Sequence, residues 1–592
     1  MRSFRRFKFY EKGDHMTHTE LYNEWLKKAT EDADLQKELL SIEGDENAIY
    51  ERFYTTLKFG TAGLRGTIGA GTNRMNIYVV RQATQGLANF VLNKYGKGAV
   101  AISHDSRIKA DLFMIEAARV LAANGIKTYI TGELQPTPVL SYLVRYFKCQ
   151  AGIMVTASHN PAKYNGYKAY GEDGCQMTDN NANAVYTEIQ KLDMFEDIKL
   201  CDFDEAVKNG LIEYVDGTVY DDYLVEVEKQ QVNPGLCKTA PLKVVYTPLN
   251  GAGNILVRRA LADIGVTDVH VVKEQEMPDG NFTTCPKPNP ELPEALELAL
   301  KLCDEVKPDL LLATDPDSDR VAIAAPKPDG SYRLFSGNET GAMLTEYILS
   351  CRKAQNNLPE NPVLVKTIVT TKLIDSICKK YGFTPTDVLT GFKYIGEVIL
   401  GLEQKGEEDR YVFGFEESCG YLSGTYVRDK DAVVASMLIC EMAAYYRAKD
   451  ISLCALMDSI YEEHSYFINK TLNFDFEGAS GMTTMAKIMT DLRNDPPKTV
   501  AGFDVVASAD YLESVGKDLL TGETVEIKLP KSNVLSYSLT DKNACIVRPS
   551  GTEPKIKLYI TGVGDTAAAA DKVVDRIAAD MKEKMGIKDK KE

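Results

Sequence analysis

The feature that most constrains this chain is a long alternation of short apolar runs with helical patterns, from about residue 60 to residue 465. The runs are rich in β-branched residues, and stretches such as residues 111–124 and 292–303 between them have helical periodicity. Such alternation is typical of βαβ units on largely parallel sheets. The apolar runs are residues 99–102, 152–155, 243–246, 309–313, 363–365 and 410–413.

The two ends of the chain have different patterns. Residues 20–40 are rich in Leu, Glu, Lys and Ala and predict a helix that carries the only tryptophan, Trp25. Residues 505–539 and 544–560 predict antiparallel strands, and residues 566–585 predict an amphipathic helix. We therefore expect an α/β protein whose C-terminal domain is smaller and α+β.

The length of 592 residues exceeds what one hydrophobic core organises. At roughly 150 residues a domain, it predicts about four domains. We predict an N-terminal tail and helix followed by a first domain with a serine loop, a second with an acidic loop, a third with a Glu-Glu-Ser loop and a fourth with an arginine loop. These five parts are residues 1–45, 46–228, 229–335, 336–465 and 466–592.

Composition excludes several classes of protein. The net charge of −16 argues against a nucleic-acid partner, which needs a basic face. The sequence has no stretch of about 18 apolar residues, so it predicts no membrane span. The 12 cysteines form no C-x-x-C pair, and the basic residues 1–13 lack the apolar segment of a secretory signal. We therefore expect a cytoplasmic protein with reduced thiols, and leave the tail out of the fold prediction.

A first candidate loop, residues 156–161 (Thr-Ala-Ser-His-Asn-Pro), directly follows an apolar run. Ligands bind outside the carboxyl ends of buried parallel strands, so Ser158 is a candidate nucleophile. A Ser/Asn turn without catalytic role is the alternative. Neighbouring side chains point apart in extended chain, and no G-x-S-x-G elbow surrounds Ser158, so Ser158 and His159 do not predict a hydrolase triad.

A second loop, residues 315–320 (Asp-Pro-Asp-Ser-Asp-Arg), also follows an apolar run. Asp315, Asp317 and Asp319 would repel one another unless a hard divalent cation lay among them. An EF-hand is excluded, because its sixth and twelfth positions would be Arg320 and Pro326. A solvated acidic turn is the alternative, and three Asp with one phosphoserine oxygen would suit Mg²⁺.

Two further loops offer polar groups. Glu416 and Ser418, in residues 414–418 (Gly-Phe-Glu-Glu-Ser), can hold vicinal sugar hydroxyls, although a surface acidic turn is the commoner reason for such a sequence. In residues 548–555 (Arg-Pro-Ser-Gly-Thr-Glu-Pro-Lys), Arg548 offers a bidentate fork to phosphate oxygens. Gly551 can turn backbone N–H groups inward beside the Ser550 and Thr552 hydroxyls. A polar hairpin is the alternative for this loop.

Together and in this order, the four loops resemble the signatures of the α-D-phosphohexomutase superfamily, over residues 55–562. Chain length and the Gly-Phe-Glu-Glu-Ser context are most similar to its phosphoglucomutase/phosphopentomutase branch. The resemblance implies three related mixed α/β domains and a smaller α+β C-terminal domain around a central cleft, with one signature loop from each domain.

The resemblance also implies roles for individual residues. Ser158 would be phosphorylated and would share Mg²⁺ with the three aspartates, and His159 would support it. Lys168 would transfer protons, with a pKa lowered by the metal and nearby arginines. Sugar and phosphate groups would be bound by Glu416, Ser418, Arg548, Ser550, Gly551 and Thr552, with added positive charge from Arg65, Arg320, Lys393 and Arg428.

The implied activity is the interconversion of glucose 1-phosphate and glucose 6-phosphate through glucose 1,6-bisphosphate, with a hexose phosphate as the substrate. A phosphopentomutase, a phosphomannomutase, a phosphatase and a non-catalytic phosphosugar-binding protein are the alternatives. Phe415 stands where many members of the superfamily have Gly, and Asn250 stands where many have His. Both leave the preferred sugar open, and the sequence does not fix the oligomeric state.

Overall fold

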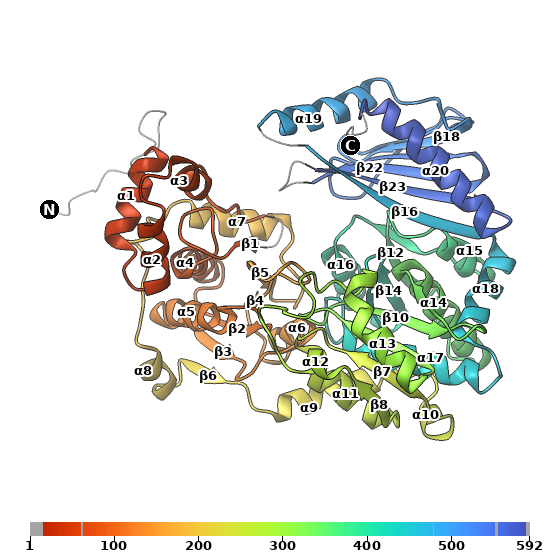
Figure 1. The fold of residues 1–592 in the computed structure, drawn as a ribbon, viewed down its shortest axis with the longest axis horizontal. Helices are drawn as coiled ribbons and strands as arrows, with labels where there is room; N and C mark the ends of the chain where they lie inside the picture. The colour runs from red at the N-terminus through yellow and green to blue at the C-terminus, as the bar shows by residue number, and fades with distance from the viewer. Residues whose placement is uncertain (1–15, 61–62, 477–478, 551–554, 588–592) are drawn as a thin grey trace.

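The fold is described from a computed structural model, which covers residues 16–60, 63–476, 479–550 and 555–587. Four β-sheets follow one another along the chain. In Figure 1 the N-terminal part lies on the left, the second sheet at the lower right, the third above it on the right and the C-terminal sheet at the upper right. None of the helices in these ranges is long and apolar enough to cross a membrane.

The first sheet has six strands in the order β1-β5-β4-β2-β3-β6. β4, β2, β3 and β6 are parallel, whereas β1 and β5 run antiparallel to their neighbours. The strands are β1 (Gly63–Thr67), β2 (Ala99–His104), β3 (Lys127–Ile130), β4 (Ala151–Val155), β5 (Tyr164–Gly171) and β6 (Ile212–Tyr214). The helices are α4 (Ile77–Tyr95), α5 (Ala110–Ala123), α6 (Thr137–Tyr146), α7 (Asp179–Ile189) and α8 (Phe203–Lys208).

The second sheet has five strands in the order β11-β10-β9-β7-β8. β9, β7 and β8 are parallel, and the hairpin strands β10 and β11 complete one edge. The strands are β7 (Lys243–Thr247), β8 (Asp268–Val271), β9 (Leu310–Thr314), β10 (Val321–Pro326) and β11 (Tyr332–Phe335). The helices are α9 (Thr218–Glu228), α10 (Leu236–Thr239), α11 (Gly253–Ile264), α12 (Lys273–Glu276) and α13 (Glu297–Val306).

The third sheet has four strands in the order β13-β12-β14-β15, of which β15 is antiparallel. The strands are β12 (Val363–Thr367), β13 (Thr386–Val388), β14 (Tyr411–Glu416) and β15 (Gly420–Leu422). The helices are α14 (Gly337–Ala354), α15 (Leu373–Lys380), α16 (Phe392–Glu403), α17 (Ala432–Arg447) and α18 (Leu453–His464). Two of these helices have side-chain N-caps that accept hydrogen bonds from first-turn N–H groups: Ser336 caps α14 and the buried Asp431 caps α17.

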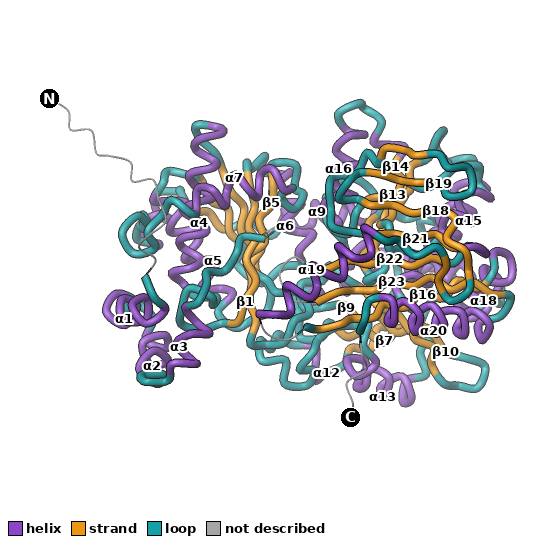
Figure 2. The backbone as a smooth tube through the Cα atoms, turned by 90° about the horizontal axis from the view of Figure 1, so that it is seen from above, coloured by secondary structure: helices purple, strands orange, loops and turns teal. Residues whose placement is uncertain are grey.

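The fourth sheet is antiparallel, with β16-β23-β22-β21-β18-β19-β20 in order and β17 paired to β18. Figure 2, seen from above, shows this sheet over the right-hand part, with α19 at its end nearest the first sheet. The strands are β16 (Tyr466–Asp475), β17 (Thr499–Val500), β18 (Phe503–Asp510), β19 (Val515–Asp518), β20 (Thr524–Glu526), β21 (Leu535–Leu539), β22 (Ala544–Pro549) and β23 (Lys555–Gly564). The helices are α19 (Ala479–Asn494) and α20 (Ala567–Lys584).

The buried parallel strands set where the loops of interest lie. Every residue of β4 and β9 is buried, as expected for parallel strands covered on both faces. The residues that follow them are Thr156 and Asp315, so the serine loop and the acidic loop both begin at carboxyl strand ends. The two sheets therefore fix the positions at which the serine loop and the acidic loop start.

Three short helices precede the first sheet: α1 (His18–Lys28), α2 (Ala33–Ser41) and α3 (Glu46–Phe53). The single helix predicted for residues 20–40 is wrong, because Asp32 caps a new helix by accepting from the N–H groups of Asp34 and Leu35. Trp25 is only 1% exposed. It makes edge-to-face contacts with Phe53, Tyr78 and Phe195, which fasten these helices to the first domain.

Replacing Trp25 by Ala should lower the free energy of unfolding of the first domain by about 3–5 kcal/mol, because it leaves a large cavity among aromatic rings. Urea unfolding followed by circular dichroism measures this change. Leu40→Ala on α2, whose side chain is 58% exposed, is the matched control and should change it by no more than about 0.5 kcal/mol. Equal effects of the two substitutions would contradict the docking role of Trp25.

Candidate active site

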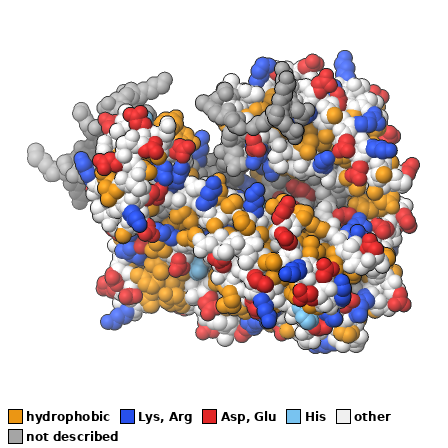
Figure 3. Space-filling model, in the orientation of Figure 1, with side chains coloured by type: hydrophobic (Ala, Val, Ile, Leu, Met, Phe, Trp, Pro, Cys, Tyr) orange, Lys and Arg blue, Asp and Glu red, His pale blue; other side chains and the backbone are white. Residues whose placement is uncertain are grey.

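A cavity of about 1070 Å³ lies where the four sheet regions meet. The space-filling view shows the surface hollowed below the C-terminal part, with basic and acidic side chains around the hollow (Figure 3). Each region contributes polar side chains to the lining. These include His159 and Asp179 from the first region, Glu291 and Arg320 from the second, Lys393, Glu416, Glu417 and Ser418 from the third, and Arg548 and Lys557 from the fourth.

Ser158 lies in the turn after β4, where its backbone has a φ of 52°. Residues other than glycine adopt this left-handed region infrequently. The Ser158 N–H donates to Thr156 Oγ1 at 2.8 Å, and Ser158 Oγ donates to Asp315 Oδ2 at 2.9 Å. The turn therefore places the candidate nucleophile against the acidic loop of the second region.

His159 lies beside this hydroxyl, with Nδ1 3.1 Å from Ser158 Oγ. We expected from the sequence that the two side chains would point apart; that is wrong, because the left-handed turn brings them to the same side. Burial lowers the pKa of His159 well below its ordinary value, and the Arg320 and Arg65 cations lower it further. The imidazole is therefore neutral near pH 7 and able to exchange a hydrogen bond with the serine.

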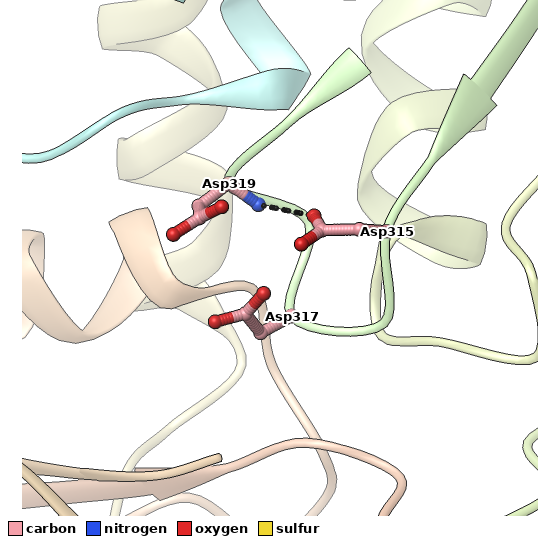
Figure 4. Close-up of side chains that lie close together, drawn as sticks. All are labelled: Asp315, Asp317 and Asp319. Carbon is pink, nitrogen blue, oxygen red and sulfur yellow. Dashed lines mark hydrogen bonds between the residues drawn. The ribbon is translucent and has the colours of Figure 1, made fainter. Parts of the chain in front are cut away.

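Three carboxylates from the loop between β9 and β10 face one another (Figure 4). Asp315, Asp317 and Asp319 are buried and each offers an oxygen within 4.8 Å of the others. Asp319 N donates to Asp315 Oδ1 at 3.1 Å, which closes the loop around these side chains. Within the described residues, Asp317 Oδ1 and Asp319 Oδ1 are buried without a hydrogen-bond partner. Such clustered, unsatisfied oxygens fit a divalent cation.

The pKa shifts of two of these carboxyl groups show that placing the three together in a buried loop is electrostatically costly. Burial raises the pKa of Asp315 well above its ordinary value, and the charges of Asp317 and Asp319 raise it further. Burial also acts to raise the pKa of Asp317, but the nearby Lys168 ammonium outweighs it and leaves that pKa lowered. Thr137 Oγ1 adds a hydrogen bond of 3.0 Å to Asp317 Oδ2.

Two lysines supply positive charge to this cluster. Lys168 Nζ lies 2.8 Å from Asp317 Oδ2 and 3.4 Å from Asp319 Oδ2, and Lys430 Nζ lies 3.2 Å from Asp319 Oδ2. Burial lowers the pKa of Lys168, but the two carboxylates outweigh it, so the pKa is raised. The lowered pKa predicted for Lys168 is therefore wrong in this arrangement, since its nearest charges are anionic.

The Glu-Glu-Ser loop begins at the end of β14 and lines the cavity. Glu416 Oε1 accepts a 2.8 Å hydrogen bond from Gly391 N. Glu417 Oε2 accepts from the hydroxyls of Thr367 and Thr370 at 3.3 and 3.4 Å. Burial and the neighbouring Glu416 raise the pKa of Glu417 to about 7, so it changes charge near neutral pH. Ser418 is partly exposed in the same lining.

The C-terminal sheet brings basic groups to the opposite wall. Arg548 on β22 lies across the ladder from Lys557 on β23, and both line the cavity. Burial and the Arg548 charge lower the pKa of Lys557. Ser550 N donates to Lys555 O at 2.7 Å, whereas the predicted Gly551 and Thr552 lie outside the described residues.

Two further predicted cations border the cavity. Arg320 Nε lies 3.6 Å from Asp319 Oδ1, and its Nη1 lies 3.8 Å from Glu291 Oε2. Lys393 Nζ lies 2.6 Å from Asp179 Oδ1, an ion pair that joins the first and third regions. Both cations lie where an anionic ligand in the cavity would meet them.

The other two predicted cations lie differently. Arg65 is on β1 and pairs in the ladder with Gly166, outside the cavity lining. Arg428 is buried and does not line the cavity, so its predicted place near the phosphates stays a prediction. Arg428 Nη2 lies 2.7 Å from Glu403 Oε2, its Nη1 donates to Thr425 O, and its N–H donates to Ser141 Oγ.

The sequence did not single out three of the residues near this site. Lys430 lies two positions after Arg428, and no spacing rule tells which of the two faces the acidic loop. Arg107 follows β2, where the rule of carboxyl strand ends would have drawn attention to it. Lys557 has the alternation of a strand residue, which indicates a face of the sheet without saying what covers it.

Four family descriptions match consecutive parts of the chain. Phosphoglucomutase/phosphomannomutase alpha/beta/alpha domain I matches residues 56–196, domain II residues 221–330 and domain III residues 336–464. The C-terminal domain of the same family matches residues 493–580. With the four sheets, these matches confirm the predicted fold of three mixed α/β domains and a C-terminal domain, while the exact predicted boundaries stay a prediction.

Curated relatives and solved structures agree with these matches. Phosphoglucomutases of Staphylococcus saprophyticus and Staphylococcus aureus are 35% and 34% identical, over 91% of this chain and 95% and 94% of theirs. The open form of pp63/parafusin, an exocytosis-sensitive phosphoprotein and phosphoglucomutase from Paramecium, has a TM-score of 0.67 at 17% identity, covering 90% of this chain and 96% of its own. A phosphoglucomutase/phosphomannomutase family protein from Burkholderia thailandensis has a TM-score of 0.64 at 20% identity, covering 89% and 97%.

Mg²⁺ or Mn²⁺ should raise the melting temperature. A cation that binds the folded acidic loop and not the unfolded chain stabilises the folded protein by about 2.7 kcal/mol when its concentration is a hundredfold above Kd. Differential scanning calorimetry with and without EDTA measures this. Asp317→Asn should abolish most of the shift, while Asp304→Asn, an exposed carboxylate outside the cluster, should keep it. A shift retained in Asp317→Asn would rule out the cluster as the metal site.

Glu417→Gln should raise the melting temperature at pH 8 and change it little at pH 5. The folded pKa of about 7 lies above the ordinary value of 4.5, so this carboxyl contributes stability below pH 4.5 that is lost as the pH rises to about 7 and the partly buried group ionises. Glutamine removes that ionisation. Melting curves at the two pH values test this, with the exposed Glu305→Gln on α13 as control. An equal effect of Glu417→Gln at both pH values would contradict the assignment.

Proposed function

The chain belongs to the phosphoglucomutase/phosphomannomutase family, and we propose that it is an enzyme that interconverts glucose 1-phosphate and glucose 6-phosphate. The resemblance drawn from the four loops is thereby confirmed at the level of the family. The observation that carries the proposal is the position of Ser158 Oγ, 2.9 Å from the acidic loop and beside a cavity lined by basic groups from the second, third and fourth domains. A phosphorylated hydroxyl, a cation site and anion-binding groups thus meet at one place.

In the proposed reaction, phospho-Ser158 gives its phosphoryl group to the free O6 of glucose 1-phosphate. The Oγ–P bond breaks, an O6–P bond forms and the hydroxyl proton leaves. The resulting glucose 1,6-bisphosphate reverses its orientation in the cavity. Its C1 phosphoryl group is then transferred back to Ser158 Oγ, which leaves glucose 6-phosphate. The same bisphosphate would phosphorylate an enzyme whose serine is free.

Arg320 is the last residue of the acidic loop and would bind transferring phosphoryl oxygens. Mg²⁺, held by Asp315, Asp317, Asp319 and an oxygen on Ser158, would spread the charge that develops on those oxygens. Lys168 would exchange the hydroxyl proton. Its ammonium is paired with two aspartates, which favour the charged form. The neutral amine that could accept that proton would therefore form only when those carboxylates have another cation as partner.

The remaining groups would hold the part of the sugar phosphate that is not reacting. Glu416 and Ser418 would bind sugar hydroxyls, because a carboxylate accepts and a hydroxyl both accepts and donates. Lys393, Arg548 and Ser550 would bind the distant phosphate. The sugar must reverse between the two transfers, and a cavity of about 1070 Å³ leaves room for both orientations.

Ser158→Ala should keep the fold and reduce turnover by at least about 10³-fold, because the phosphoryl carrier is lost. The assay combines purified protein, Mg²⁺, a trace of glucose 1,6-bisphosphate and glucose 1-phosphate, and couples glucose 6-phosphate to NADPH formation. Ser459→Ala, an exposed serine on α18, should retain full activity. Near-normal turnover of Ser158→Ala would overturn the nucleophile assignment.

Turnover of ribose 1-phosphate and mannose 1-phosphate, with ribose 5-phosphate and mannose 6-phosphate quantified directly, identifies the sugar. A higher kcat/KM on either one would keep the phosphoserine mechanism but replace the proposed substrate. Inactivity on all three sugar phosphates, with metal binding intact, would favour a phosphosugar-binding protein.

A further inference from the structure

Arg107 gathers the backbone of the serine loop around one side chain. Its Nη2 donates to the carbonyl oxygens of Ser158 and Asn160, each at 2.5 Å. Its Nη1 donates to those of Pro161 and Tyr164 at 3.1 and 2.9 Å. Four carbonyl groups of residues 158–164 therefore converge on a single guanidinium. This set of bonds defines the course of the loop from the nucleophile to the start of β5.

A second set of contacts connects the same arginine to the start of the loop. Arg107 Nε lies 3.4 Å from Asp105 Oδ2 as an ion pair, and its backbone N–H donates to Asp105 Oδ1 at 3.0 Å. Thr156 Oγ1 donates to Asp105 Oδ2 at 2.5 Å and accepts from Ser158 N at 2.8 Å. Both ends of the left-handed turn at Ser158 are thus fixed from residues that follow β2.

The second domain covers this arrangement. The Phe282 ring lies over the Arg107 guanidinium, with 5.0 Å to the ring centroid. The backbone at Gly280 approaches so closely that an added Cβ would lie 2.7 Å from Ile108 N and 2.8 Å from Ser106 O. The arginine side chain is fully buried as a result. No substrate in the cavity can reach it, and Arg107 is absent from the cavity lining.

We infer that Arg107 is a positioning residue for the phosphoryl-carrying loop, an inference that rests on the proposed role of Ser158. A buried guanidinium is costly unless its donors are satisfied; Nε is ion-paired with Asp105 but makes no hydrogen bond, and the Nη donors are directed at the loop carbonyls. The hydrogen bonds of the Arg107 guanidinium hold the turn in which Ser158 Oγ faces Asp315. Lysine cannot reproduce this, because one ammonium cannot span four carbonyl groups arranged around a plane.

Arg107→Lys should lower kcat by about 30-fold or more, because displacement of a reacting group by about 1 Å costs on the order of 10²-fold. KM for glucose 1-phosphate should change by less than about threefold, because the arginine does not touch substrate. Arg81→Lys is the matched control: Arg81 is buried in the same domain, bonded to Glu31 and Glu116, and has no contact with the loop. It should lower the melting temperature but leave kcat within about twofold.

Chemical rescue separates positioning from a general loss of structure. Guanidinium at tens of millimolar should restore kcat of Arg107→Ala by about tenfold, whereas methylammonium at the same concentration should not. If Arg107→Ala does not fold, the Arg107→Lys and Arg81→Lys comparison decides. Unchanged kcat in Arg107→Lys, or equal kcat losses in the two lysine variants, would overturn the inference. A wild-type protein without mutase turnover would instead overturn the proposed function.

Discussion

The structure depends on the neutralisation of three carboxylates that one loop gathers in a buried place. Asp315, Asp317 and Asp319 belong to the second domain, but two of their cationic partners do not: Lys168 comes from the first domain and Lys430 from the third. Charges buried in a medium of low dielectric constant must be paired, so these ion pairs act as ties between domains. The candidate catalytic centre is also the point at which ion pairs connect three domains.

The serine loop shows a related constraint, met with different chemistry. Its φ of 52° at Ser158 is unfavourable for a side-chain-bearing residue, and the surrounding contacts must hold it. Hydrogen bonds to Thr156 and from Arg107 do so from inside the first domain, while Phe282 closes the space from the second. The loop that carries the nucleophile is thus held by its backbone contacts, while the Ser158 hydroxyl donates to Asp315 of the second domain.

Sequence reasoning succeeded where one local rule decided the position. Ser158 and the three aspartates follow fully buried strands, and ligand-binding loops lie at the carboxyl ends of such strands. It did not reach positions that depend on contacts between distant segments. Arg428 and Lys430 are nearly adjacent, yet only the lysine faces the acidic loop, because Glu403 and Ser141 hold the arginine elsewhere. The break at Asp32 was missed because helix propensity on both sides outweighed one capping residue.

The origin of Lys168, Asp319 and Lys430 in three successive domains has a consequence for synthesis. A ribosome releases the acidic loop well before Lys430, and at roughly 5–20 residues a second the delay is several seconds or more. During that interval the second domain can form its sheet, but the loop lacks one of its counter-charges and stays hydrated. Final closure of the acidic loop therefore has to wait for the third domain, which makes completion of this site a late event in the life of each new chain.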